Sequence, residues 1–257
     1  MNSFFTLSGV AKNFGGVRAV DNMSFALEKG ELVGLMGPNG AGKTTIFNLV
    51  TGVYGLDGGQ ISFKGENLEK LKPHQITARG IARTFQNLRL FQRSTALENV
   101  MTAAQYHITY SFAECITHLG RWREKEGKIR EKSMNLLDRV GLADRAGQAA
   151  GTLPYGFQRR LEIARALALD PDLLLLDEPA AGMNAEEVAS LNELIKGIHR
   201  DFGLTILVIE HHMDLVMEIC PRIICMNFGA KIAEGAPGEI QNHPEVLRAY
   251  LGEEDDE

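Results

Sequence analysis

The stretch Gly37-Pro38-Asn39-Gly40-Ala41-Gly42-Lys43-Thr44 combines three glycines with a lysine and a threonine at its end. Glycines let the backbone curl so that several N–H groups point inward, where they can bind phosphate oxygens. The Lys43 ammonium can reach the terminal phosphates of a nucleotide, and the Thr44 hydroxyl can bind Mg²⁺. A plain turn has no use for these two side chains, so the spacing predicts a phosphate-binding loop.

The segments on either side of this loop are of the kind that it requires. The apolar run before it, residues 32–36, predicts a buried strand, and residues 45–50 after it predict a helix. The N-terminus of that helix would add its positive end to the phosphate site. GTPases, kinases, motors and transport ATPases all use such a loop, so a second motif has to decide the reaction.

Two carboxylates, Asp177 and Glu178, follow four consecutive leucines. The apolar run is typical of a strand that is covered on both faces. Beside a phosphate-binding loop, Asp177 is a candidate Mg²⁺ ligand, and Glu178 is a candidate general base for the attacking water. The alternative is an acidic pair that faces solvent without a catalytic role.

The other segments predict an α/β core with an antiparallel part. Gln86 ends a predicted buried strand, at the edge of the sheet where ligands collect in open α/β folds. Further strands are expected at residues 5–7, 23–27, 60–63, 81–86, 173–178 and 205–209, with a hairpin at 222–226 and 231–234. Helices are expected at residues 73–79, 186–202 and 244–251.

Strand signals vanish between residues 87 and 152, where residues 121–132 carry many charges of both signs. Mixed charges at helical spacing usually form a solvated helix face. The sequence therefore predicts a core formed by residues 1–86 and 153–257, with a helical subdomain, residues 87–152, inserted into it. The last residues, 253–257, form a separate acidic tail.

The charge balance gives no sign of a nucleic-acid-binding protein. The net charge is −6 over 257 residues, but the last five residues are all acidic. Without them, 28 of the 33 acidic residues remain against 27 basic ones, a nearly neutral body. We expect no nucleic-acid partner.

The cysteines and the apolar segments indicate the compartment. Cys115, Cys220 and Cys225 are scattered and odd in number, which is typical of a reducing cytosol. No apolar run approaches the ~20 residues of a membrane-spanning helix, and the N-terminus lacks the pattern of a secretory signal. If the protein serves a membrane, we expect it to do so through a partner.

Residues 153–167 begin with Leu153-Pro154-Tyr155-Gly156-Phe157 and resemble the signature motif and following helix of the ABC-transporter ATPase family. The resemblance covers essentially the whole chain and implies the P-loop ABC ATPase fold, with a mixed sheet core, an antiparallel β part and an inserted helical subdomain. The motifs stand in the family's order: Phe14 of the aromatic loop, the phosphate loop, Gln86, the signature, Asp177-Glu178, the turn at 180–184 and His211.

The resemblance implies a head-to-tail dimer in which each ATP lies between the phosphate loop of one subunit and the signature of the other. Glu178 is then the general base, His211 contacts the γ-phosphate, and His212 has no catalytic role. Mg²⁺ and its waters are assigned to Thr44, Gln86 and Asp177. ATP contacts are assigned to Phe14, Gly37, Pro38, Asn39, Gly40, Ala41, Gly42, Lys43, Thr44, Thr45, Gln86, Tyr155 and Gly156.

The signature departs from the family pattern at two positions. Pro154 stands where the family has a serine whose hydroxyl reaches the γ-phosphate, and Phe157 stands where it has glutamine. These changes favour, mildly, a regulatory subunit that binds nucleotide but hardly hydrolyses it. The retained Glu178 and His211 favour an active ATPase. A soluble ABC ATPase without a transport role is a further alternative, although such proteins usually have two cassettes or long coiled coils.

Within the family, the chain is most similar to the ATP-binding subunits of branched-chain amino-acid importers, the LivG type. The residues that carry this similarity are 83–91, 155–156, 177–184, 209–211 and 248–253. It implies permease subunits and a second ATPase subunit as partners, an indirect link to a periplasmic or extracellular binding protein, and a place on the cytoplasmic face of the membrane. Urea, other amino acids, aromatic acids and lipopolysaccharide export are alternative substrates. We expect the permease to contact residues 87–103, with Leu88 and Leu90 in the contact.

Overall fold

The computed structural model describes residues 4–108, 121–211 and 213–251, which fall into two compact units. The core unit comprises Met1–Arg83 with Asp172–Glu257, and the helical unit comprises Thr84–Pro171. The helical unit is longer than the insertion expected at 87–152, because it also takes in the helix that follows the signature. Cys115, His212 and the acidic tail lie outside the described residues.

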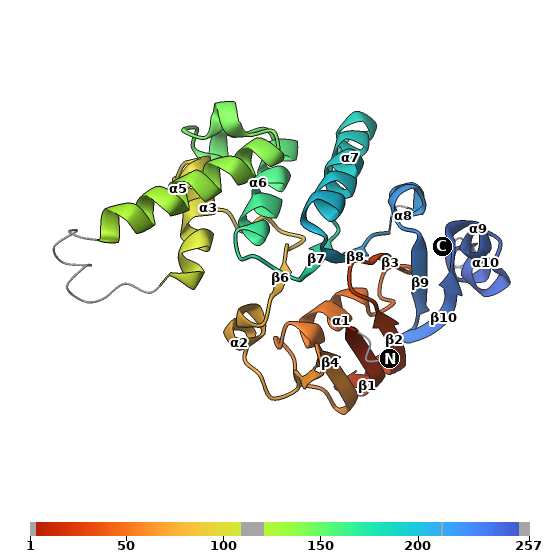
Figure 1. The fold of residues 1–257 in the computed structure, drawn as a ribbon. Helices are drawn as coiled ribbons and strands as arrows, with labels where there is room; N and C mark the ends of the chain where they lie inside the picture. The colour runs from red at the N-terminus through yellow and green to blue at the C-terminus, as the bar shows by residue number, and fades with distance from the viewer. Residues whose placement is uncertain (1–3, 109–120, 212, 252–257) are drawn as a thin grey trace. The chain divides into compact units, whose positions relative to one another are not determined.

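A six-stranded sheet runs through the core unit in the order β10-β9-β3-β8-β7-β6 (Figure 1). All neighbouring pairs are parallel except the β9–β10 hairpin. Every residue of the β3, β7 and β8 segments is buried, which explains their unbroken apolar sequences. The strands are β3 (Leu32–Met36), β6 (Ile81–Arg83), β7 (Leu173–Asp177), β8 (Thr205–Ile209), β9 (Arg222–Asn227) and β10 (Ala230–Gly235).

A second, antiparallel sheet of the core unit has the order β2-β1-β4-β5. Its strands are β1 (Phe5–Phe14), β2 (Val17–Leu27), β4 (Gly58–Phe63) and β5 (Glu66–Asn67). The first two extend much further than the sequence predicted and meet at a tight turn of two glycines. Buried side chains of both sheets join those of the helix after the phosphate loop, including Phe47, in one hydrophobic core.

The helices of the core unit are α1 (Lys43–Val50), α2 (Pro73–Ala78), α7 (Ala185–Phe202), α8 (Met213–Ile219), α9 (Pro237–Gln241) and α10 (Pro244–Leu251). α7 begins where Asn184 and Glu187 cap each other's backbone N–H groups, and it ends at Gly203, whose φ is 61°. The sequence did not predict α8 and α9, because helices of seven and five residues are too short for a clear periodicity.

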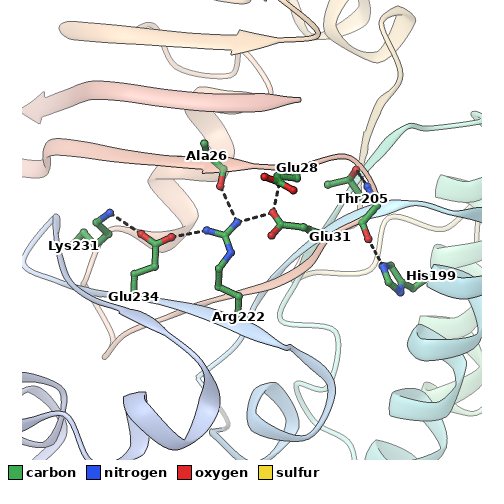
Figure 2. A network of polar contacts seen from close by, with 9 residues as sticks. Ala26, Glu28, Glu31, His199, Thr205, Arg222, Lys231 and Glu234 are labelled. Carbon is green, nitrogen blue, oxygen red and sulfur yellow. Dashed lines mark hydrogen bonds and ion pairs between the residues drawn. The ribbon is translucent and has the colours of Figure 1, made fainter. Parts of the chain in front are cut away.

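Arg222 joins the two sheets at the ends of the parallel strands where β3, β8 and β9 begin (Figure 2). Its guanidinium donates to the Ala26 carbonyl of β2 at 2.8 Å and to the Glu31 carboxylate at 2.6 Å, and it also pairs with Glu234 of β10. A second link runs from Gly30, whose N–H donates to the Thr205 hydroxyl at 2.9 Å. We call these contacts the Arg222 network.

The helical unit consists mainly of α3 (Ala96–Ala104), α5 (Arg121–Arg139) and α6 (Tyr155–Leu167), which pack side by side (Figure 1). Short 3₁₀ turns lie at Gln105–His107, Ala143–Arg145 and Ala150–Thr152. Ile129, Leu136 and Leu137 form the buried face of α5, whereas most of its charged residues are exposed. The mixed charges therefore form a solvated face, as predicted.

The strand predicted to reach Gln86 ends at Arg83, because the side chain of Arg159 donates hydrogen bonds to the backbone carbonyls of two following residues, Phe85 and Gln86.

Burial raises the pKa of the Cys220 and Cys225 thiols to about 12, so both are inert at neutral pH. Among the described residues, none of the helices has the length and apolar character that crossing a bilayer demands.

Candidate active site

The phosphate loop leaves the end of β3 and enters α1, as the sequence predicted. A Cβ atom on Gly37 would lie 2.3 Å from the Met226 carbonyl oxygen of β9, and one on Gly42 would lie 2.3 Å from the Ala19 carbonyl oxygen of β2. Gly42 also has a φ of 100°, which L side chains rarely adopt. The loop is thus held between two strands that leave space only for glycine.

Lys43 and Thr44 begin α1 and differ in exposure. The Lys43 ammonium is buried and donates to the Gly37 and Pro38 carbonyls, the latter at 2.9 Å. Thr44 is exposed on the first turn of the helix, and Thr45 is half-buried beside it. One cation and one solvent-facing hydroxyl therefore stand where the loop meets the positive end of the helix.

The close fit of the loop leads to a first prediction. Changing Gly42 to alanine should cost about 2 kcal/mol of unfolding free energy from the left-handed φ and the clash with Ala19. We expect affinity for a fluorescent ATP analogue to fall at least tenfold, and urea unfolding to report the stability loss.

The control for that experiment is Gly197→Ala in α7, where the backbone φ is ordinary and an added Cβ meets no atom within 4 Å. It should gain up to about 1 kcal/mol from helix propensity and leave nucleotide binding unchanged. Equal effects of the two alanines would contradict the special role of the loop geometry.

Asp177 ends β7 with 2% of its side chain exposed and forms an ion pair with Arg83, which is 5% exposed. The Arg83 Nη2 atom lies 2.6 Å from Asp177 Oδ2, and Nη1 donates to the Asn48 side-chain oxygen of α1 at 2.7 Å. The guanidinium also stands over the Phe47 ring, 5.4 Å from its centroid. Arg83 thus ties α1 and β6 to the carboxylate at the end of β7.

Arg83 was not among the predicted site residues. Its signal was present, because a lone charge in an otherwise apolar predicted strand requires a buried partner of opposite charge. The signal did not reveal that the partner would be Asp177, which lies far away in the sequence.

Glu178 and His211 are brought together by the neighbouring strands β7 and β8, which pair in parallel with Asp177 opposite Ile209. The Glu178 carboxylate lies 3.8 Å from the imidazole Nδ1 atom of His211. Glu178 has the unusual φ of 45°, and its N–H donates to the Ile209 carbonyl at 2.9 Å. A left-handed conformation at a non-glycine residue is a strain that often marks functional sites.

Glu210 supports this pair and was also missed. It is fully buried at the end of β8 and accepts a hydrogen bond from the Ala180 N–H at 2.9 Å. Its other oxygen lies 3.9 Å from His211 Nδ1. Glu210 therefore connects the end of β8, next to His211, to the turn that follows Glu178.

Sheet order explains why these residues gather. β3, β8 and β7 are adjacent, and the phosphate loop, His211 and Glu178 each follow the carboxyl end of one of them. Ligands bind at this edge in open α/β sheets. The arrangement can hold a phosphate chain beside a carboxylate that accepts a proton from water.

Phe14 lies at the end of β1, with 41% of its surface exposed. Its ring packs edge-on against Tyr54, with centroids 5.1 Å apart, and the Lys12 ammonium lies 5.4 Å from its centroid. Lys12 is itself paired with Asp57 at 2.8 Å, and this pairing lowers the pKa of Asp57. The exposed face of the ring is available to stack on a planar ligand.

The remaining predicted site residues belong to the helical unit. Gln86 is exposed just after the unit begins, whereas Tyr155 and Gly156 form the first turn of α6, with Tyr155 exposed and Gly156 buried. The helix begins at Tyr155, and Pro154 precedes it without a side-chain cap.

Comparison with known proteins decides the family. The model of the family described as "ABC transporter" matches residues 20–181, a span that includes the phosphate loop, the signature and Asp177 with Glu178. The chain belongs to the ABC transporter family. It is an ABC ATPase, as the signature predicted, and it accordingly binds nucleotide. A second family model, described as "Branched-chain amino acid ATP-binding cassette transporter", matches residues 230–256.

This ABC ATPase is also similar to individual proteins. The chain is 44% identical over 247 residues to the high-affinity branched-chain amino acid transport ATP-binding protein LivG of Salmonella typhimurium, covering 96% of this chain and 97% of LivG. It is also similar to a crystal structure of the ADP conformation of an ATP-binding cassette of an ABC transporter, with a TM-score of 0.85 and 28% identity over 98% of this chain and 100% of that one. A dimeric cassette in a post-hydrolysis state, bound to ADP and Pi, gives a TM-score of 0.76 at 25% identity over 91% of this chain and 98% of that one.

Proposed function

We propose that this ABC ATPase energises the uptake of branched-chain amino acids through a membrane permease, from the cytoplasmic face of the membrane. The observation that carries the proposal is the 44% identity to LivG over almost the full length of both chains. The match of residues 230–256 to the branched-chain family model supports the same substrate class.

The residues present fit ATP with Mg²⁺. No group of three or more histidine, cysteine, aspartate or glutamate side chains that could hold a metal by itself occurs in the described part of the chain. Mg²⁺ on a nucleotide needs no such cage, since it keeps several waters and takes one or two protein ligands besides the phosphates. Thr44, Gln86 and Asp177 would hold the ion, which when bound offsets the charge that develops on the phosphates.

The chain's own residues then share the work of hydrolysis. The N–H groups of the phosphate loop and the Lys43 ammonium bind the β- and γ-phosphates, and Phe14 stacks on the adenine. Glu178 accepts the proton of the attacking water, while Glu210 fixes the turn behind it. His211, 3.8 Å from Glu178, contacts the γ-phosphate and responds to its loss.

A second cassette completes the site. Tyr155 and Gly156 lie in the first turn of α6, so the backbone N–H groups of that turn and the helix dipole are directed toward any phosphate in front of it. We assign them to the nucleotide of the opposite subunit. One solved cassette that this chain resembles is a dimer bound to ADP and Pi, which supports a dimeric working form. The partner is either a second copy or a homologous ATPase subunit.

The substrate is tested by transport. Cells that lack their own uptake systems receive this chain with the permease and binding-protein subunits of its transporter, and ATP-dependent uptake of labelled leucine is measured. Uptake that unlabelled isoleucine and valine suppress supports the proposal. Uptake of labelled urea or an aromatic acid instead, with no leucine transport, would assign the same ATPase to another importer.

The structure refines the surface that we assign to the permease, residues 87–103. Leu90 was proposed as a contact, but only 8% of it is exposed, so a charge there would test folding rather than docking. The next residue, Phe91, is 50% exposed, and the Asn99 side chain holds its backbone N–H and carbonyl at 2.9 and 3.1 Å. Phe91 is thus an exposed aromatic group on a backbone that Asn99 holds, and aromatic side chains of this kind often anchor interfaces.

We therefore expect Phe91→Glu to reduce leucine uptake at least tenfold while the isolated chain keeps its ATPase activity, because a charge in the centre of an interface must be desolvated. The matched control is Phe202→Glu at the end of α7, an aromatic group of similar exposure, which should transport normally. Normal uptake by Phe91→Glu would exclude this residue from the permease contact.

A further inference from the structure

Arg159 is an almost fully buried arginine in α6, with 3% of its surface exposed. Its guanidinium uses all three nitrogens. Nε donates to the Tyr155 hydroxyl at 3.0 Å, Nη1 donates to the Phe85 carbonyl at 2.9 Å, and Nη2 donates to the Gln86 carbonyl at 2.5 Å. One side chain thus bridges the first turn of the signature helix and the backbone of Gln86.

Glu162, one helical turn further along α6, also contacts this backbone segment. It accepts from the Phe85 N–H at 3.3 Å, and its other oxygen lies 3.4 Å from Arg159 Nη1. Burial raises the pKa of Glu162, while the hydrogen bond from Phe85 and the charge of Arg159 oppose that rise. The backbone at residues 85–86 is therefore held through both N–H and C=O groups by a buried pair on one helix face.

The neighbouring arginine of α6 serves a different purpose. Arg160 donates to the Val140 carbonyl at 3.2 Å, and its guanidinium lies 5.9 Å from the centroid of the Phe157 ring. The two residues are alike in type and adjacent in sequence, but Arg160 binds the backbone that follows α5, at Val140. Arg160 is thus a natural control for Arg159.

We propose that Arg159 is a positioning residue that couples Gln86 to Tyr155. The inference rests on the proposed function, in which Gln86 serves the nucleotide of its own subunit and Tyr155 serves the nucleotide of the opposite one. Because the guanidinium is planar and rigid, a shift of the backbone at residues 85–86 moves the donor that fixes the Tyr155 hydroxyl. The state of the nucleotide in one subunit thereby changes the affinity of that subunit for the nucleotide of the opposite subunit.

The coupling is measured as non-additivity in ATP-driven dimerisation. In a Glu178→Gln background, which is expected to trap the ATP-bound dimer, the dimer dissociation constant is determined by analytical ultracentrifugation for Gln86→Ala, Tyr155→Phe and the double variant. We expect the combined effect to differ from the product of the single effects by about tenfold, a usual size for coupled sites. With Arg159→Lys added, the effects of Gln86→Ala and Tyr155→Phe on the dissociation constant should multiply to within about twofold. An ammonium cannot reproduce the three hydrogen bonds of the planar guanidinium.

The control adds Arg160→Lys instead, which should leave the tenfold coupling in place, and thermal unfolding checks each variant for folding. Coupling that persists in Arg159→Lys would overturn the proposal. So would purely multiplicative effects of Gln86→Ala and Tyr155→Phe in the chain that retains Arg159, a result that does not depend on how any Arg159 variant folds. The proposed function fails in a distinguishable way: the Glu178→Gln chain would then form no ATP-dependent dimer with itself or with its homologous ATPase subunit.

Discussion

Replacing Glu178 by glutamine will nearly abolish ATP hydrolysis while ATP binding persists and a dimer accumulates. The amide keeps the size of the side chain and can hold the attacking water, but it cannot accept its proton. General-base catalysis contributes about 10²–10⁴-fold, so we expect the rate of phosphate release to fall by that factor. Size-exclusion chromatography with ATP and Mg²⁺ should then show the variant as a dimer.

The control for this prediction is Glu186→Gln, the same chemical change at an exposed position in the first turn of α7. It should retain normal hydrolysis. The strained φ of 45° at Glu178 is equally demanding for glutamine, so lost activity cannot be assigned to the backbone. A variant that keeps more than a tenth of the wild-type rate would show that Glu178 is not the principal base.

Replacing Arg83 by methionine should remove about 3–5 kcal/mol of unfolding free energy, because the buried carboxylate of Asp177 then loses its ion pair with the guanidinium. The hydrogen bond to Asn48 disappears as well. Urea unfolding measures the loss. Adding Asp177→Asn should recover most of the stability by removing the buried negative charge, although we do not expect it to recover ATPase activity.

An exposed ion pair provides the comparison. Lys196 lies 2.9 Å from Glu218 on the surface, and both the pair and its hydrogen bonds are open to solvent. Lys196→Met should change the unfolding curve little, since exposed pairs contribute little to stability. If Arg83→Met were equally mild, or if Asp177→Asn failed to rescue it, the Arg83–Asp177 pair would not be the strong buried contact that its geometry indicates.

Much of this architecture could be predicted from local patterns. The glycines, Lys43 and Thr44 predict a loop whatever surrounds them, and the leucines before Asp177 predict a strand that is buried on both faces. The meeting of Glu178 and His211 also follows, since both come after predicted core strands and the carboxyl ends of parallel strands share one edge.

What could not be predicted depends on contacts between distant parts of the sequence. Nothing local says that Arg83 pairs with Asp177, or that Arg159 ends the strand before Gln86 by binding its carbonyls. The burial of Leu90 beside the exposed Phe91 likewise depends on how the helical unit packs, because the sequence does not show which of two adjacent apolar residues is buried. These misses concern register and partners rather than the kinds of element.

The Arg222 network has a consequence for what the core unit can recognise. Arg222 fastens β2 to β3, β9 and β10 at one end, while Ala19 of β2 packs against Gly42 at the other. These contacts hold the sheet that carries Phe14 against the sheet that carries the phosphate loop. Because we assign Phe14 to the adenine and the loop to the phosphates, we expect the core unit alone to keep the two ends of its nucleotide site at a fixed distance. We therefore expect it to bind a ligand that lacks either end more weakly.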